Sequence, residues 1–111
     1  MNLKKETRLL LVSEIDGYIV GVVIRGYAGI EGVSVYRSCF ELYNALLSKK
    51  GILAEVNYVV EVGSCRNINN IKALRLEDIE DRDIKKAVEE TIRIIELAKL
   101  RFRQLKAMQI Y

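Results

Sequence analysis

The stretch TRLLLVSEIDGYIVGVVIR, residues 7–25, decides the fold class of this chain. It holds two apolar, β-branched runs, residues 7–13 and 18–25, separated by the pair Asp16-Gly17. Asp-Gly between two apolar runs is a strong signal for a β-hairpin with a two-residue turn. Both runs are apolar on both faces, which is typical of strands that helices or a partner chain cover on two sides. We therefore expect a hairpin at the centre of the fold.

A third strand and a short helix are predicted next. Residues 33–37 are another β-branched run of strand length. Ser38 and Glu41 have the spacing of a capping box, in which a hydroxyl and a carboxylate satisfy the first free N–H groups of a helix. Gly51 stands where a glycine commonly ends a helix. The sequence thus predicts a capped helix between Ser38 and Gly51.

The second half of the chain adds one or two strands and a long helix. Residues 52–62 have the pattern of a strand with one apolar face, and residues 71–76 fit either a short strand or an extended connection. Residues 78–111 contain no Gly or Pro; the segment begins with acids and ends with bases, which suits the helix dipole. We predict a single α+β domain, residues 1–111, in the order β-β-β-α-β-(β)-α, with a mainly antiparallel sheet of three to five strands.

The predicted C-terminal helix is longer than the domain that carries it. A compact chain of this length has a diameter of about 34 Å, whereas a helix from residue 82 to 110 extends for about 42 Å. The alternative is a helix that breaks near residue 97 and folds back. We expect the continuous helix and the apolar hairpin to form a homodimer or a higher oligomer. The predicted interface side chains on one helix face are Ile84, Val88, Ile95, Ala98, Phe102 and Leu105, with Ile94, Leu97 and Met108 widening the stripe.

The last turns of this helix carry basic charges alone. Lys99, Arg101, Arg103 and Lys106 lie between residues 98 and 111, where the sequence has no acid. Such a row can contact nucleic-acid phosphates without reading base sequence. Sequence-nonspecific nucleic-acid binding is therefore a second hypothesis. The alternative is a solvated helix face whose cations stabilise the helix C-terminus, and the net charge of +3 is too mild to imply nucleic acid by itself.

The two cysteines, Cys39 and Cys65, are too few for a disulfide-rich scaffold or a four-ligand zinc site. We expect two reduced, buried thiols. A single bridge between them is the alternative, and it would suit a hyperthermophilic source, toward which the many Ile, Lys and Glu residues lean weakly. Cys39 falls in the first turn of the predicted helix, where the thiolate is favoured. A small thiol or metal-dependent enzyme is therefore a third hypothesis.

Composition argues against several classes of protein. Half of the residues are hydrophobic and 30% are charged, as in a globular domain. The chain has no histidine, which is the commonest general base and the commonest metal ligand. The longest uncharged apolar run, residues 17–24, is far shorter than the ~20 residues of a membrane helix, and no leader peptide opens the chain. The leading hypothesis is a cytoplasmic, non-enzymatic assembly protein without cofactor, metal or membrane contact.

Overall fold

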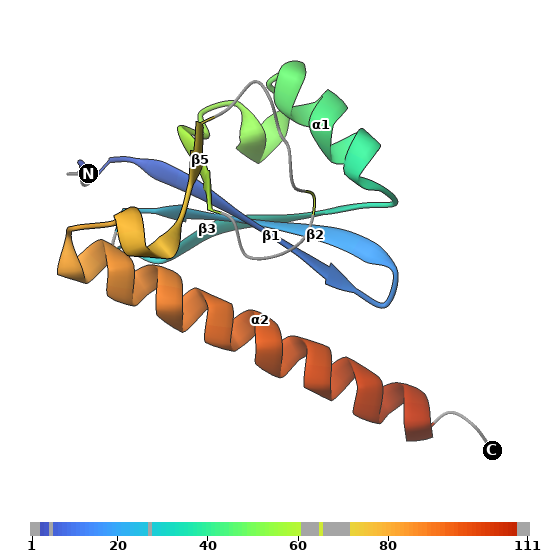
Figure 1. Ribbon diagram of the computed structural model, residues 1–111. Coiled ribbons are helices and arrows are strands. Elements are labelled where there is room, and N and C mark those ends of the chain that lie inside the picture. Colours follow the sequence, from blue (N-terminus) through green and yellow to red (C-terminus); the bar gives the residue numbers. More distant parts are fainter. Residues whose placement is uncertain (1–2, 5, 27, 61–64, 66–71, 109–111) are drawn as a thin grey trace.

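The protein folds into one five-stranded sheet with a helix on each side (Figure 1). The computed structural model describes residues 3–4, 6–26, 28–60, 65 and 72–108. The elements are β1 (Arg8–Ile15), β2 (Tyr18–Arg25), β3 (Ile30–Tyr36), α1 (Cys39–Leu47), η1 (Gly51–Leu53), β4 (Tyr58–Val60), β5 (Lys72–Leu74), η2 (Leu76–Asp78) and α2 (Arg82–Met108). The predicted α+β class and the predicted order of the elements are both confirmed.

The sheet is mixed, and the expectation of a mainly antiparallel sheet is met in only one half of it. The strand order is β3-β2-β1-β4-β5. Strand β2 is antiparallel to both β1 and β3, whereas β4 runs parallel to both β1 and β5. Parallel neighbours require a long crossover connection. The segment that contains α1 supplies it and returns the chain to the free edge of β1.

The hairpin of β1 and β2 forms as predicted. Asp16 and Gly17 both have positive φ, 52° and 82°. These values suit a two-residue turn whose twist matches that of the strands. The turn joins Ile15 to Tyr18, and the pairing continues without a shift as far as Arg8 and Arg25.

The start of α1 also matches the prediction, with one difference. Ser38 is the N-cap, and its Oγ accepts a hydrogen bond from the Glu41 N–H at 3.2 Å. The Glu41 carboxylate accepts from the N–H of Arg37, at 2.8 Å, rather than from that of Ser38. The reciprocal bond of the capping box is therefore displaced by one residue along the chain.

The end of α1 differs from the prediction, because Gly51 does not terminate it. The helix ends at Leu47, and Lys49 adopts the left-handed conformation, with φ of 50°. The N–H of Lys50 donates to the Ala45 carbonyl and that of Lys49 donates to the Leu46 carbonyl. These two bonds form a Schellman motif with lysine where glycine is usual.

The predicted strand over residues 52–62 is wrong for most of its described length. Residues 51–53 form the 3-10 helix η1, and the strand β4 is confined to Tyr58–Val60. Residues 61 and 62 lie outside the described part of the chain. Leu53 is buried on the α1 side of the sheet, and Ile52 packs against that core. Packing thus overrides the local strand pattern.

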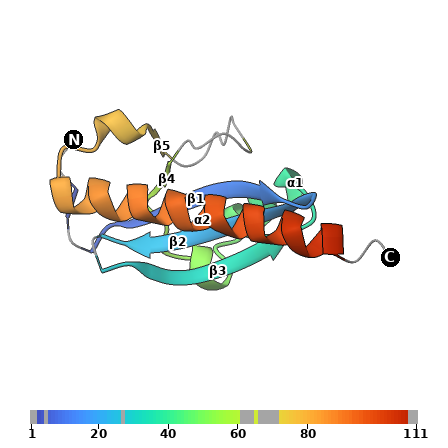
Figure 2. The same cartoon turned by 90° about the horizontal axis from the view of Figure 1, so that it is seen from below.

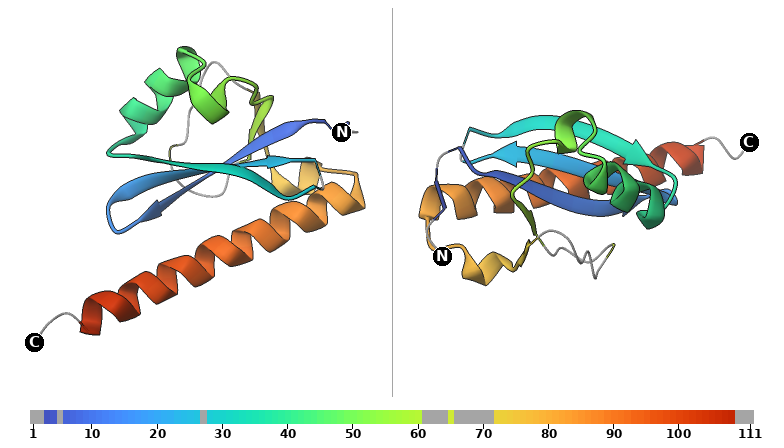
Figure 3. Two further views of the ribbon diagram at one scale, coloured as in Figure 1. Left: turned by 180° about the vertical axis from the view of Figure 1, so that it is seen from behind. Right: turned by 90° about the horizontal axis from the view of Figure 1, so that it is seen from above.

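Figure 3 shows α1 and α2 on opposite faces of the sheet, and each face has its own core. One core lies between the sheet and α2, and the other lies between the sheet and α1 with η1. Leu9 and Leu11 of β1 face α2, whereas Leu10 and Val12 face α1. All four side chains are fully buried. The prediction of a hairpin covered on two sides therefore holds for β1.

Helix α2 is continuous, so the alternative of a break near residue 97 is wrong. Its 27 residues extend for about 40 Å, and the molecule measures 51 × 30 × 21 Å. The Asp81 carboxylate caps the helix by accepting from the N–H groups of Asp83 and Ile84 at 2.9 and 3.2 Å. Figure 2 shows the C-terminal end of α2 projecting past the sheet. Residues 109–111 of the predicted helix lie outside the described residues.

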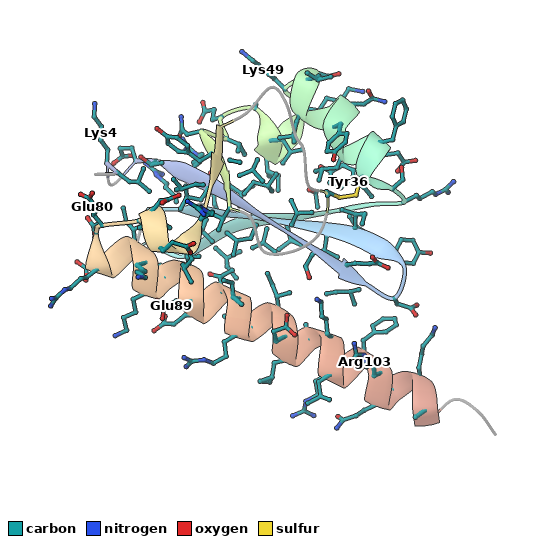
Figure 4. The ribbon with its side chains drawn as sticks, viewed as in Figure 1. Lys4, Tyr36, Lys49, Glu80, Glu89 and Arg103 are labelled. Atoms are coloured by element: carbon teal, nitrogen blue, oxygen red, sulfur yellow. A yellow bond between two sulfur atoms is a disulfide. The ribbon has the colours of Figure 1, made fainter. Side chains whose placement is uncertain are left out.

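The two cysteines form a disulfide, so the expectation of reduced thiols is wrong. The Cα atoms of Cys39 and Cys65 lie 5.4 Å apart, although the residues are 26 positions apart in the sequence. Figure 4 shows the bond beside the start of α1. Residue 65 belongs to the connection between β4 and β5. The bridge therefore ties this connection to the first turn of α1.

Candidate functional site

The outer strand β3 has one open apolar face. Val33 and Val35 pair with Val22 and Val20 of β2, so they point to the same side of the sheet as α2. Helix α2 does not cover them, and they are 56% and 60% exposed. Figure 2 shows why: α2 runs across the middle of the sheet, and β3 lies to one side of it. We call Val33 and Val35 the open face of β3.

A second apolar surface lies along one flank of α2. Ile94, Leu97 and Leu105 are 56%, 54% and 58% exposed, and Ala98 is exposed between them. We call these four residues the assembly flank. Arg93, Ile94, Leu97, Ala98 and Arg101 line a hollow of about 360 Å³ on this flank.

The assembly flank and the open face of β3 lie on the same side of the molecule. Ile92, on the other flank of α2, packs against the core that includes Leu74 of β5. In a right-handed helix, Ile94 lies about 160° around the axis from Ile92. It therefore points toward the β3 side, where Figure 2 shows no covering element. Two apolar surfaces from distant parts of the sequence thus border one uncovered region.

The residues predicted for an oligomer interface divide into two groups. Ile84, Val88 and Ile95 are buried in the core between α2 and the sheet, so a second chain has no access to them. Ala98 and Leu105 are exposed, and Phe102 is 40% exposed. Helical periodicity shows that the apolar stripe is broad. It does not show which part of the stripe the chain's own sheet covers.

Three of the four predicted nucleic-acid contacts, Lys99, Arg103 and Lys106, share one face of α2, whereas Arg101 lies on another. The Lys99 ammonium lies 3.6 Å from the Glu96 carboxylate. Lys106 forms an ion pair with Asp16 in the hairpin turn. Arg101 lines the hollow on the assembly flank, whereas Arg103 lies on a different side of the helix, about 200° around the axis. Two of the four cations are therefore already paired with carboxylates.

An ion-pair network that the sequence analysis did not predict lies at one end of the sheet. Arg8 bonds to Glu31 at 2.7 Å and to Glu55 at 2.8 Å. Arg25 bonds to Glu6 and lies 3.8 Å from Glu31. The hydrogen bonds that Arg25 donates to the Glu6 carboxylate, together with the negative charge of that carboxylate, raise the pKa of Arg25. These partners come from four separate segments, so only the folded chain brings them together.

The described residues offer little to a catalytic hypothesis. Cys39, the candidate nucleophile, is part of the disulfide. Within the described ranges, no three Cys, Asp or Glu side chains are placed to hold a metal ion. No helix in this part of the chain is long and apolar enough to cross a membrane.

Comparisons with known proteins give no family. No family model matches the chain, and no curated protein matches it. Among solved structures, the chain is similar to the catalytic core domain of BIV integrase, with a TM-score of 0.49 and 13% sequence identity. The match covers 81% of this chain and 66% of that one. A likeness at this level says nothing about activity.

Proposed function

We propose that this protein is a small assembly protein that forms a homodimer through the assembly flank of α2 and the open face of β3. One observation carries the proposal: exposed apolar side chains from β3 and α2 border the same uncovered region. Single exposed apolar residues are common on monomeric proteins, but contiguous apolar surfaces mark interaction sites. A second copy would remove both surfaces from water.

The composition of the surface supports protein contact rather than a small-molecule site. Ile94, Leu97 and Ala98 form the apolar part of the hollow on the assembly flank, and the charges that border this hollow are Arg93 and Arg101. Apolar side chains edged by arginine are typical of protein interfaces. The hollow is formed by one helix alone, whereas a ligand pocket usually encloses its ligand between several elements.

The test is the mass of the protein in solution. The double variant Ile94→Glu/Leu97→Glu places charges in the apolar surface, and we expect it to be monomeric at micromolar concentrations where the unmodified protein is dimeric. Leu47→Glu is the matched control, because Leu47 is 57% exposed but lies on α1, across the sheet. Light scattering measures all three masses. A single-chain mass for the unmodified protein would refute the proposal.

The nucleic-acid hypothesis has less support. Lys99 and Lys106 are paired with carboxylates, and Arg101 and Arg103 lie on different sides of α2. An enzyme has less support still, because its candidate nucleophile is held in the disulfide. Neither alternative accounts for the exposed apolar surface.

A further inference from the structure

We infer that two copies pair their α2 helices antiparallel, with Glu90 of each copy facing Arg101 of the other. This inference rests on the proposed homodimer and adds its geometry. It follows from the spacing of residues on the assembly flank, from the shape of the hollow, and from the placement of two charges.

Residues at seven-residue intervals lie in rows along this side of α2. Ala87, Ile94 and Arg101 follow one another at intervals of seven, and Glu90, Leu97 and Gln104 each come three residues later. Two helices pair along such positions in a coiled coil. In an antiparallel pair, Ile94 of one copy would meet Leu97 of the other. The same register places Ala87 opposite Gln104 and Glu90 opposite Arg101.

The residues that line the hollow on the flank are compatible with this pairing. Ile94, Leu97, Ala98 and Arg101 are residues i, i+3, i+4 and i+7 of one helix, and they line the hollow. Four residues at this spacing form the hole that receives one side chain of a facing helix. The centre of the hollow, at residues 97 and 98, faces Ile94 of the second copy in the proposed register.

The charges favour this register over its neighbours. Sliding the second helix by seven residues in one direction sets Ile94 against Glu90, and in the other direction it sets Leu97 against Arg101. A parallel pair would set Glu90 against Glu90 and Arg101 against Arg101, which is repulsive. Glu90 and Arg101 are both exposed, and within the described residues neither forms an ion pair. In the proposed register the dimer would contain two ion pairs, each between Glu90 of one copy and Arg101 of the other.

Charge reversal tests the register apart from the dimer itself. Glu90→Arg and Arg101→Glu each oppose like charges, and we expect each to raise the dimer dissociation constant about tenfold or more. An equimolar mixture of the two variants restores both ion pairs in a heterodimer, so we expect association close to that of the unmodified protein. Arg103→Glu is the matched control, because it makes the same change on a different side of the helix. Circular dichroism verifies that each variant is folded.

The outcomes separate the two proposals. A monomeric unmodified protein would overturn both. A dimer that Ile94→Glu/Leu97→Glu disperses, but that neither charge reversal weakens, would overturn the register and leave the homodimer standing. Failure of the mixture to associate would also overturn the register.

A distance measurement gives an independent answer. Gln104→Cys provides one free thiol for a nitroxide, because the native cysteines are bridged. In the antiparallel register, the two labels are about 26 Å apart along the helix axes. In a parallel pair they are separated mainly by the interhelical distance of about 10 Å. Pulsed electron paramagnetic resonance distinguishes the two, and the short distance would overturn the inference.

Discussion

The two faces of strand β3 differ in how far the rest of the molecule covers them. On the α1 side, η1 covers the strand so closely that a Cβ on Gly32 would lie 2.9 Å from Ile52 Cγ2. On the α2 side, Val33 and Val35 remain more than half exposed. The two valines of this strand thus lie on its uncovered face, whereas Tyr36 packs on the covered one. The difference teaches that an apolar face in the sequence becomes core only where another element reaches it.

The same contrast divides the faces of α2. Ile84 and Val88 are fully buried against the sheet, whereas Ile94, Leu97 and Leu105 on the assembly flank are mostly exposed. We therefore expect the face of α2 toward the sheet to stabilise the fold and the assembly flank to support association.

We expect the largest difference in stability between truncation of a core isoleucine and truncation of an exposed one. Ile84→Ala removes a fully buried side chain, and we expect it to lower the free energy of unfolding by about 4 kcal/mol. Ile94→Ala makes the same change at an exposed position, and we expect less than about 0.5 kcal/mol in dilute, monomeric protein. Urea denaturation measures both values. Equal losses would show that the sheet-facing side of α2 and the assembly flank do not differ.

We expect removal of the disulfide to cause the next largest loss of stability. The bridge lies on the α1 side of the sheet. Cys39→Ser/Cys65→Ser removes a bridge between residues 26 positions apart. By the chain-entropy argument, we expect the free energy of unfolding to fall by about 3 kcal/mol. The dimer dissociation constant should not change, because the bridge lies across the sheet from the assembly flank. A change in that constant would contradict the separation of the two faces.

We expect substitutions on the open face of β3 to have the smallest effect on stability. Threonine has the shape of valine and suits strands, so we expect Val33→Thr/Val35→Thr to change the free energy of unfolding by less than about 0.5 kcal/mol. The dimer should weaken severalfold, because two hydroxyls enter the interface. Val22→Thr is the matched control: it buries a hydroxyl on the same side of the sheet, and we expect a loss of about 1–3 kcal/mol. Similar losses in both variants would show that β3 is not open.

Local signals explain what the sequence predicted well. Asp16-Gly17 defines the turn through its own backbone preferences, and Ser38 caps α1 through a bond to the residue three positions later. The absence of Gly and Pro after residue 78 leaves α2 unbroken. Each of these features depends on residues that are close in the sequence.

Long-range contacts explain what the sequence could not predict. The parallel direction of β4 depends on the path of the crossover connection that precedes it, and the disulfide depends on how the fold brings Cys65, which follows β4, to the start of α1. The oligomer prediction identified Ala98 and Leu105, which are exposed, but it also included Ile84 and Val88. A helical pattern cannot separate the side chains that contact the sheet from those that extend past it.

The parallel pairing of β1 with β4 has a consequence for the order of folding. Strands β1, β2 and β3 pair with their neighbours in the sequence, whereas Arg8 bonds to Asn57, at a separation of 49 residues. Contacts across such a separation form late, because closing the intervening chain costs entropy. We therefore expect the three-stranded meander to form before β4 pairs with it. Until then both β1 and β3 are free edges, and the nascent chain exposes two sites where another strand can add.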